Sequence, residues 1–339
     1  MLKLSVLDQS VAMAERPHAR SIQETLALAQ HCEALGYHRF WVSEHHSHPS
    51  IVGTAPEVLM AAIAMKTERI RIGSAGVMLP HYSALKVAEQ FRVLDALAPG
   101  RIDLGVGRAP GSDGRTAFAL NPNANTAAAQ FPRQVQDLIA WVTGSPLPDG
   151  HPFREIGAHP LATDIDTAPD VWMLGTSEYG AQVAAHFGLP YSFAHFITEG
   201  RGTAQAIDLY RSQYQPSERH PEPLANICVW ALTAETEAEA ERLFTSRARS
   251  RLSRDRGLLQ PIMPPSDDFA NAFSAVERPR VDMMRRNAFV GTPDRVGARL
   301  RELGAELGLD EIVVLTWTYD LEPRKRSYAL LAEEFGLNA

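Results

Sequence analysis

Long apolar runs and cysteines are scarce in this sequence of 339 residues. No stretch approaches the roughly 18 consecutive apolar residues that a membrane-spanning helix needs. The amino-terminal residues form a strand-like run without the long apolar core of a signal peptide. Cys32 and Cys228 lie far apart in apolar surroundings, which is typical of buried free thiols rather than of a disulfide framework. We therefore expect a cytoplasmic protein without a membrane segment.

An excess of basic residues is also missing. The formal net charge is −7, with 33 Lys and Arg against 40 Asp and Glu, which argues against nucleic acid as the main partner. Two local basic runs, residues 247–251 and 324–326, fall where amphipathic helices are expected. We expect both runs to lie on solvated helix faces. A chain of this length can bury a large core without a disulfide or a structural metal.

Short aliphatic runs alternate with longer segments of helical period along the chain. Eight runs have the character of buried strands, namely residues 2–7, 39–43, 70–75, 101–107, 170–175, 190–195, 227–232 and 311–317. Amphipathic segments suited to helices lie at residues 21–34, 56–65, 84–97, 181–187, 235–249, 293–307 and 324–334. This count predicts an α/β fold, a single (β/α)8 TIM barrel over residues 1–339. A doubly wound open sheet is the alternative, because alternation alone does not demonstrate closure.

Three segments do not fit the repeat. Residues 109–125 and 143–169 are rich in Pro, Gly, Asn and Asp, and we interpret them as long loops. Residues 252–291 form a still longer segment, which contains Pro-Ile-Met-Pro-Pro at 261–265. Because unstructured loops of this length are usually functional, we expect an insertion before the eighth strand that forms a lid over the barrel mouth.

Small residues recur where the third and fourth strands end. Alternation along a strand directs Gly73 and Ala75 into the barrel from one strand, and Gly105 and Gly107 from the next. Strand positions without a side chain often mark the close approach of a ligand. The pattern predicts space for a large, flat ligand.

Polar side chains are expected at the same rim. The second strand runs into Glu44-His45-His46-Ser47-His48, the fourth into Arg108, and the fifth into Thr176 and Ser177 before a helix. Hydroxyls and free amides at a helix start can hold a phosphate, and Arg108 can supply a fixed positive charge. Together these features predict a planar, phosphorylated cofactor. Asp8 and His195, which end the first and sixth strands, are candidates for lining a substrate pocket.

Two other interpretations of these motifs are weaker. The run from Gly105 to Gly111 has Pro110 where the dinucleotide fingerprint requires its third glycine, so that interpretation fails. His45, His46 and His48 suggest a metal site, but adjacent strand residues point to opposite faces and cannot bind one ion together without a bend. We therefore expect no metal and assign His45 to the cofactor side.

At these residues the chain resembles the bacterial luciferase-like flavin-dependent monooxygenases. The resemblance is carried, in family order, by Phe40-Trp-Val-Ser-Glu-His-His46, Gly73-Ser-Ala-Gly-Val-Met-Leu-Pro80, Gly100-Arg-Ile-Asp-Leu-Gly-Val-Gly-Arg108, Leu174-Gly-Thr-Ser177, Ala184-Ala-His-Phe-Gly-Leu-Pro190 and Phe289-Val-Gly-Thr-Pro293. It implies reduced FMN as a co-substrate, a cis peptide at Ala75–Gly76, and a homodimer.

The resemblance also assigns roles to individual residues. It implies that Arg108, Thr176 and Ser177 hold the FMN phosphate, that Ala75, Gly76 and Gly107 lie against the ring, and that His45 is the acid/base group. Two departures matter. Gly107 stands where bacterial luciferase has a cysteine, so light emission is not implied, and Gly180 stands where that enzyme has a phosphate-binding threonine.

The leading functional hypothesis is a monooxygenase that receives reduced FMN from a separate flavin reductase. The flavin peroxide formed with O2 would oxidise a small organic substrate, an aldehyde or ketone, and His45 would carry the proton because imidazole titrates near neutral pH. An F420-dependent reductase or dehydrogenase and a non-catalytic flavin-binding protein are the alternatives on the same fold. A metal-dependent hydrolase ranks last.

Overall fold

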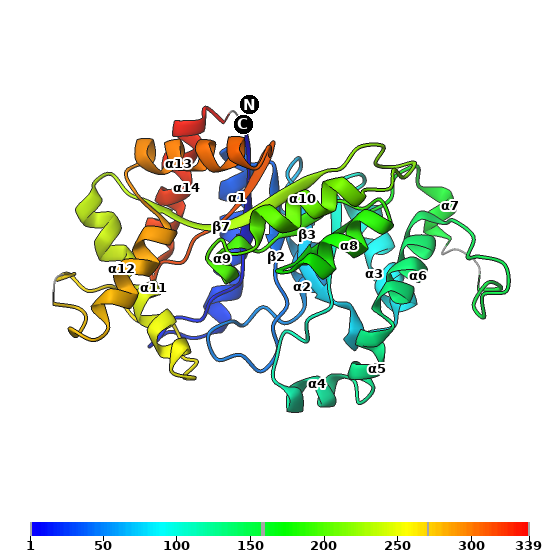
Figure 1. The fold of residues 1–339 in the computed structure, drawn as a ribbon, viewed down its shortest axis with the longest axis horizontal. Helices are drawn as coiled ribbons and strands as arrows, with labels where there is room; N and C mark the ends of the chain where they lie inside the picture. Colours follow the sequence, from blue (N-terminus) through cyan, green and yellow to red (C-terminus); the bar gives the residue numbers. More distant parts are fainter. Residues whose placement is uncertain (1, 157–159, 270, 338–339) are drawn as a thin grey trace.

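The computed structural model describes residues 2–156, 160–269 and 271–337, and its centre is a closed barrel of eight parallel strands (Figure 1). Neighbouring strands follow the order β6-β5-β4-β3-β2-β1-β9-β7, and a β6–β7 pairing closes the ring. The strands are β1 (Lys3–Asp8), β2 (Arg39–Val42), β3 (Arg71–Met78), β4 (Ile102–Gly107), β5 (Asp170–Gly175), β6 (Tyr191–Phe193), β7 (Ala225–Thr233) and β9 (Glu311–Leu315). The predicted barrel is therefore confirmed, and the open sheet is wrong.

Helices connect successive strands and surround the barrel (Figure 1). Those that match the seven expected segments are α1 (Ala19–Ala34), α2 (Pro56–Ala64), α3 (Ala84–Leu97), α8 (Glu178–His186), α11 (Glu237–Asp255), α13 (Pro293–Glu306) and α14 (Leu321–Phe335). The further helical elements are η1 (Leu79–His81), α4 (Gly114–Leu120), α5 (Ala124–Ala129), α6 (Phe131–Thr143), α7 (Leu161–Asp164), α9 (His195–Thr198), α10 (Thr203–Gln213) and α12 (Arg278–Asn287). Within the described residues, no helix is long and apolar enough to cross a membrane.

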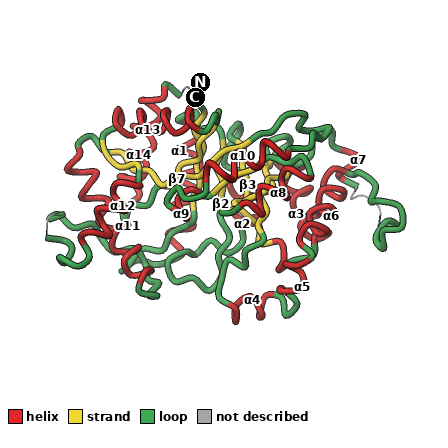
Figure 2. The backbone as a smooth tube through the Cα atoms, in the orientation of Figure 1, coloured by secondary structure: helices red, strands yellow, loops and turns green. Residues whose placement is uncertain are grey.

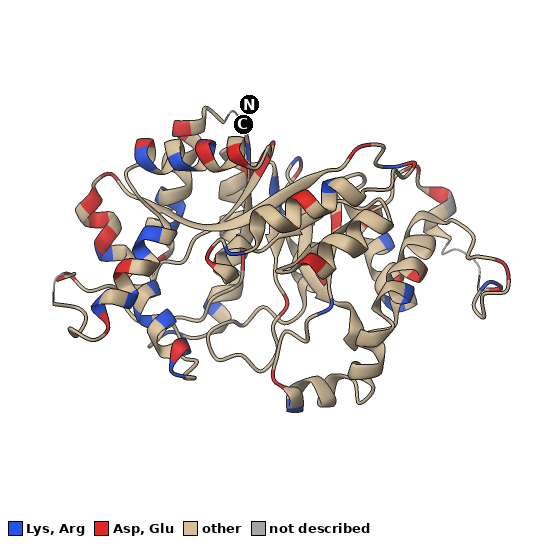
Figure 3. Ribbon diagram, in the orientation of Figure 1, with Lys and Arg blue, Asp and Glu red and all other residues tan. Residues whose placement is uncertain are grey.

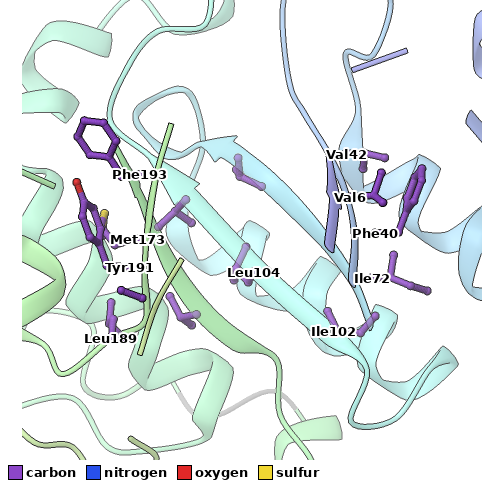
Figure 4. Close-up of a cluster of buried hydrophobic side chains, with 14 of the residues drawn as sticks. Val6, Phe40, Val42, Ile72, Ile102, Leu104, Met173, Leu189, Tyr191 and Phe193 are labelled. Atoms are coloured by element: carbon purple, nitrogen blue, oxygen red, sulfur yellow. The ribbon is translucent and has the colours of Figure 1, made fainter. Parts of the chain in front are cut away.

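Alternation along the strands divides the buried side chains into two groups. Phe40, Ile72 and Leu104 point outward and join the layer between the strands and the helices (Figure 4). Trp41 and Trp172 point inward, where their rings meet edge to face with centroids 5.1 Å apart. Burial of such side chains stabilises the fold by about 25 cal/mol per Å² of apolar surface. The inner group fills the barrel, so the lumen is a packed core rather than a pore.

A buried ion network closes the amino-terminal end of the barrel. Arg39 donates to Asp103 at 2.8 Å and to Glu311 at 2.9 Å, and Arg71 binds Asp103 and Asp170. Burial alone would raise the pKa of Asp103, but the two guanidinium groups hold it below its usual range. The Trp41 indole also donates to Asp103, at 2.9 Å. Every carboxylate here has a cationic partner, so this end is built for stability.

The expected loops contain regular structure that composition concealed. Residues 109–125 include α4, whose first turn is capped by the Asp113 carboxylate through the amides of Arg115 and Thr116. Residues 252–291 begin inside α11 and include α12 and a short strand, β8 (Phe289–Gly291), which pairs with the end of β7 outside the ring. Figure 2 shows the loops after β2 and β4 on the lower side of the view, where the strands end. Cys32 and Cys228 are buried free thiols, as expected.

Candidate active site at the carboxyl ends of the strands

The polar residues selected from the sequence follow the ends of neighbouring strands. His45 follows β2, Ala75 and Gly76 lie in β3, Arg108 follows β4 and Thr176 follows β5, and these four strands pair in that order. Contacts join the connections: the His46 amide donates to the Gly111 carbonyl at 3.3 Å, and the Met78 amide donates to Glu44 at 3.1 Å. The candidate residues therefore share one rim of the barrel.

Arg108 lies beside the start of α8. Its guanidinium carbon is 3.9 Å from the centre of the Tyr179 ring, in the first turn of that helix. Arg108 is exposed, and no carboxylate among the described residues forms an ion pair with it. Ser177 is the N-cap residue, yet its hydroxyl accepts no capping hydrogen bond, and Thr176 is exposed beside it. A cation without an ionic partner, two exposed hydroxyls and the amides of a helix start are groups that can bind a phosphate.

The peptide bond between Ala75 and Gly76 is cis, as the resemblance implied. The pairing of β3 with β4 shifts register between Ser74 and Val77, so the cis peptide lies at an irregularity of the ladder. Ala75 is partly buried and packs against the inner apolar cluster that contains Trp172 and Trp230.

The glycines near this rim lack a side chain for different structural reasons. A Cβ on Gly73 would lie 2.5 Å from the Trp41 ring, and one on Gly105 would lie 2.0 Å from the Ser74 carbonyl oxygen. Packing within the barrel thus explains these small residues, which the sequence pattern had assigned to ligand space. Gly107 differs, because the nearest atom to its Cβ position is the Met78 sulfur at 3.8 Å. Of the strand glycines singled out from the sequence, this one has room for a Cβ.

His45 is largely enclosed. Its Nδ1 lies 3.2 Å from the Ser43 hydroxyl, and its ring is 5.7 Å from that of His48. Burial, with added repulsion from His48 and Arg254, lowers the pKa of His45 to about 4. The imidazole is therefore neutral at pH 7, which corrects the expectation of a group that titrates near neutrality. It can accept a proton or donate from a neutral N–H.

The neighbouring His46 has structural partners. Its Nε2 lies 2.6 Å from Glu44, and the Tyr82 hydroxyl donates to the same carboxylate at 2.8 Å. The other oxygen of Glu44 accepts from the Met78 amide, so Glu44 joins the loops after β2 and β3. Burial and the nearby Glu44 carboxylate raise the pKa of Tyr82. His45 and His46 thus belong to two separate sets of contacts.

Asp8 lies at the end of β1 and is 1% exposed. One carboxylate oxygen accepts from Arg324 at 3.3 Å, and the other accepts from the Thr25 hydroxyl at 2.6 Å and the Ser10 amide at 3.1 Å. Protein groups occupy both oxygens. These contacts tie β1 to α1 and α14, and they give Asp8 a structural role at the position predicted for a substrate contact.

His195 begins the short helix α9 rather than ending β6. Its Nδ1 lies 3.0 Å from the Thr203 hydroxyl, and burial lowers its pKa to about 4. It lines a cavity with Trp230 and Arg247 at the end of β7. Arg247 was expected on a solvated helix face, but its guanidinium lies over the Trp230 ring at 4.0 Å. The charge pattern of α11 could not reveal which basic residue turns toward the barrel.

Comparisons with known proteins agree with this geometry. Residues 2–311 match the family model described as luciferase-like monooxygenase. The chain is 43% identical to the uncharacterized protein YwcH of Bacillus subtilis, over 99% of both chains. It is 37% identical to a luciferase-like monooxygenase of Escherichia coli, over 97% of this chain and 96% of the other. The crystal structure of apo-MsnO8 superposes with a TM-score of 0.87 at 35% identity, covering 100% of this chain and 99% of that one. The chain therefore belongs to the luciferase-like monooxygenase family of oxidoreductases.

Proposed function

We propose that the protein is a monooxygenase that uses reduced FMN and O2 to oxidise a small organic substrate, an aldehyde or ketone being the first classes to test. The observation that supports this proposal is that Arg108, without an ionic partner among the described residues, lies beside the uncapped start of α8 and next to Gly107, where a Cβ would meet no obstruction. The site can accept an anion, because Arg108 has no ionic partner among the described residues and the start of α8 has no side-chain cap. FMN would supply that anion as a phosphate, which a ribityl chain joins to its ring.

When bound in its reduced form, FMN supplies two electrons, so that one atom of O2 enters the substrate and the other leaves as water. The residues of the chain provide the surroundings for that reaction. Arg108 and the first turn of α8 would bind the phosphate, and Ala75, Gly76 and Gly107 would lie against the ring. His45 would accept or pass a proton at Nε2, since Ser43 holds its Nδ1.

Residues 258–265 support a lid over this site. The Ser50 hydroxyl donates to the Gln260 carbonyl at 2.6 Å, and the Ile262 amide donates to Ala12 at 2.8 Å. Ile262 is fully buried in a small cluster with Val11 and Met13. The segment thus crosses the loops that follow β1 and β2. Its opening would admit substrate, and its closure would exclude water.

The outer surface of α2 and α3 supports a homodimer. Val58 on α2 and Met65 at its C-cap are 64% and 71% exposed, and Val93 and Leu97 on α3 are about half exposed. The two helices contact each other, so these apolar side chains occupy adjacent elements. An exposed apolar patch of this kind is typical of a protein interface. A Met65→Lys variant should sediment as a monomer, and an unchanged sedimentation coefficient would contradict the proposal.

The cofactors to be compared are FMN and F420, because solved proteins with the same fold contain one or the other. A structure of the oxygenating constituent of 3,6-diketocamphane monooxygenase from Pseudomonas putida contains FMN, with a TM-score of 0.69 at 17% identity. An F420-dependent secondary alcohol dehydrogenase contains an F420–acetone adduct, with a TM-score of 0.67 at 15% identity. At these identities the likeness concerns the fold alone, so binding must decide between the cofactors. We propose a separate flavin reductase as the source of reduced FMN.

The deciding experiment compares FMN, riboflavin and F420 by fluorescence titration, in oxidised and anaerobically reduced forms. FMN and riboflavin differ only in the phosphate, so FMN should bind at least about tenfold more tightly. Arg108→Met should remove that difference, whereas Arg115→Met, at an exposed arginine on α4, should preserve it. Equal affinity for FMN and riboflavin would overturn the phosphate site. Preference for F420 would favour a reductase or dehydrogenase, and a lack of O2 consumption with reduced FMN and a panel of aldehydes and ketones would favour a non-catalytic flavin carrier.

A further inference from the structure

The residue after β1, Gln9, lies at the mouth of the barrel. Along β1, Val6 joins the outer layer and Leu7 joins the inner cluster. Asp8 turns outward again, since its carboxylate contacts α1 and α14. Strand alternation therefore directs Gln9 inward, one residue beyond the position that the sequence had suggested for a substrate contact.

The side chain of Gln9 is buried without a hydrogen-bond partner. It is 5% exposed, and its Oε1 is enclosed with no donor among the described residues. No described residue accepts from its Nε2 either. A buried polar group without a partner destabilises the folded protein. The fold therefore gives no reason for a carboxamide at this position, whereas a ligand does.

Gln9 shares its level of the barrel with Ser43 and Trp317. The inner residues two positions before each of them pair with one another across β2, β1 and β9. The Ser43 amide donates to the Asp8 carbonyl at 3.3 Å, which continues the register of β1 and β2 beyond the strands. Trp317 packs against the inner cluster that contains Trp230. The three residues therefore occupy one arc of the barrel mouth.

Trp317 supplies a second polar group without a partner. Its indole N–H is buried, and no described residue accepts from it. Its ring also packs against the small cluster that contains Ile262, in the segment 258–265 proposed above as a lid. Closure of that segment would enclose a ligand bound to Gln9 and Trp317.

The arc of Gln9, Ser43 and Trp317 borders His45. The Ser43 hydroxyl lies 3.2 Å from His45 Nδ1. The His45 amide donates to the Gly53 carbonyl at 3.0 Å, and a Cβ on Gly53 would lie 3.3 Å from the carbonyl oxygens of both Gln9 and Ser43. A group bound at Gln9 would thus lie beside the histidine proposed for proton transfer.

The arc offers neutral groups, namely a carboxamide, an indole N–H and a hydroxyl. The charged segments of α11 and α12, at the left of Figure 3, contain groups that pair with one another, as Arg280 does with Asp255. A charged ligand group would need an ionic partner on burial. Gln9 Oε1 needs a donor, whereas Gln9 Nε2 and the Trp317 N–H need an acceptor. A neutral amide carries a donor next to an acceptor and satisfies all three atoms.

We infer that Gln9 and Trp317 bind a neutral amide group of the substrate at the barrel mouth. As a substrate contact, this inference rests on the monooxygenase proposed above, whereas the binding of an amide does not. The carboxamide of Gln9 would form two hydrogen bonds with the ligand amide, and the Trp317 N–H would donate to the same carbonyl oxygen. Leu7 and Leu315, in the inner cluster below, would contact the apolar part of the ligand.

The test measures binding of N-butylacetamide and of butyl acetate, in which oxygen replaces the amide N–H, by ligand-observed NMR with and without oxidised FMN. Gln9→Met keeps the length of the side chain without its carboxamide, and it should lower the ratio of amide to ester affinity about tenfold. Trp317→Phe should weaken both probes, because both offer a carbonyl oxygen. Gln23→Met, at an exposed glutamine on α1, should preserve the ratio. An unchanged ratio in Gln9→Met, or no binding of the amide to the wild type, would overturn the inference.

Thermal melts of the same variants provide a readout that needs no ligand. Gln9→Met removes a buried polar group without a partner, so its melting temperature should equal or exceed that of the wild type. A lower melting temperature would show that Gln9 serves the fold, and it would also overturn the inference.

FMN titrations separate this inference from the proposed function. Gln9→Met should bind FMN with wild-type affinity, and weaker binding would place Gln9 against the cofactor instead of the substrate. If the amide requires Gln9 while the wild type fails to bind FMN, the amide site stands and the monooxygenase proposal fails. If FMN binds and the affinity ratio does not depend on Gln9, the monooxygenase proposal stands and the amide site fails.

Discussion

The two ends of the barrel differ in whether their charged side chains have ionic partners. At the amino-terminal end, Asp103 and Glu311 are buried and each contacts a guanidinium within 3 Å. At the carboxyl-terminal end, Arg108 and Arg247 lack an ionic partner among the described residues, and the histidines are held neutral. A group satisfied by the protein contributes to the fold, whereas an unsatisfied one is available to a ligand. The difference matches the division of TIM barrels into a stability face and a catalytic face.

The largest effect should come from removing a carboxylate of the buried ion network at the amino-terminal end of the barrel. Asp103→Ala leaves Arg39 and Arg71 without their shared carboxylate, and loss of one partner of a buried ion pair costs about 3–5 kcal/mol. Urea denaturation should show that loss in the free energy of unfolding. Arg108→Met is the matched change at the open end and should leave unfolding nearly unchanged. Similar losses in the two variants would erase the contrast between the ends.

At the carboxyl-terminal end, removal of the His45 side chain should lower turnover without destabilising the fold. His45→Ala should bind FMN with nearly wild-type affinity, but the rate of substrate oxidation should fall about a hundredfold or more, because general acid–base groups contribute at least that much. Stopped-flow oxidation of reduced FMN in the presence of substrate measures the rate. Turnover at the wild-type rate would refute the proton-transfer role.

The neutral histidines predict that acid weakens the fold. His45 and His195 have a pKa of about 4 in the folded protein, against about 6.5 in the unfolded chain. The unfolded state therefore binds more protons below pH 6.5, so stability is full above that pH and falls as the pH drops toward 4. Each histidine should account for about 1–2 kcal/mol between pH 7 and 5. His195→Gln should flatten the pH dependence of the melting temperature, and an unchanged slope would show that His195 is not held neutral.

The smallest effect should come from the two hydroxyls at the start of α8. Ser177→Ala combined with Thr176→Val should weaken FMN binding about fivefold, which corresponds to loss of about one net hydrogen bond. Riboflavin binding provides the control, because it lacks the phosphate that these hydroxyls would contact. An equal loss for both flavins would assign the hydroxyls to helix packing instead.

The fold was predictable because strand alternation reports burial directly. All eight barrel strands lie where the aliphatic runs predicted, and Phe40 and Trp41 face opposite sides of the wall as expected. Helices α4 and α12 were hidden because their segments are rich in turn-forming and charged residues. Helix α4 depends on the local Asp113 cap, and α12 depends on the long-range ion pair between Arg280 and Glu199.

The site was only partly predictable. His45, Arg108 and Thr176 follow neighbouring strands because their order in the sequence matches the order of strands in the barrel. The low pKa of His45 was not predictable, since it depends on enclosure and on Arg254, more than 200 positions away. Arg247 was assigned to the surface because a helical charge pattern does not reveal which face covers the barrel. Tertiary packing against Trp230 decided that question.

A crystal structure with bound FMN tests the contrast between the two ends most directly. We expect the phosphate to lie within hydrogen-bond distance of the Arg108 guanidinium and the first turn of α8, with the ring beside the Ala75–Gly76 peptide. A phosphate bound to Arg247 or Arg254 instead, or a flavin at any other surface of the barrel, would contradict it.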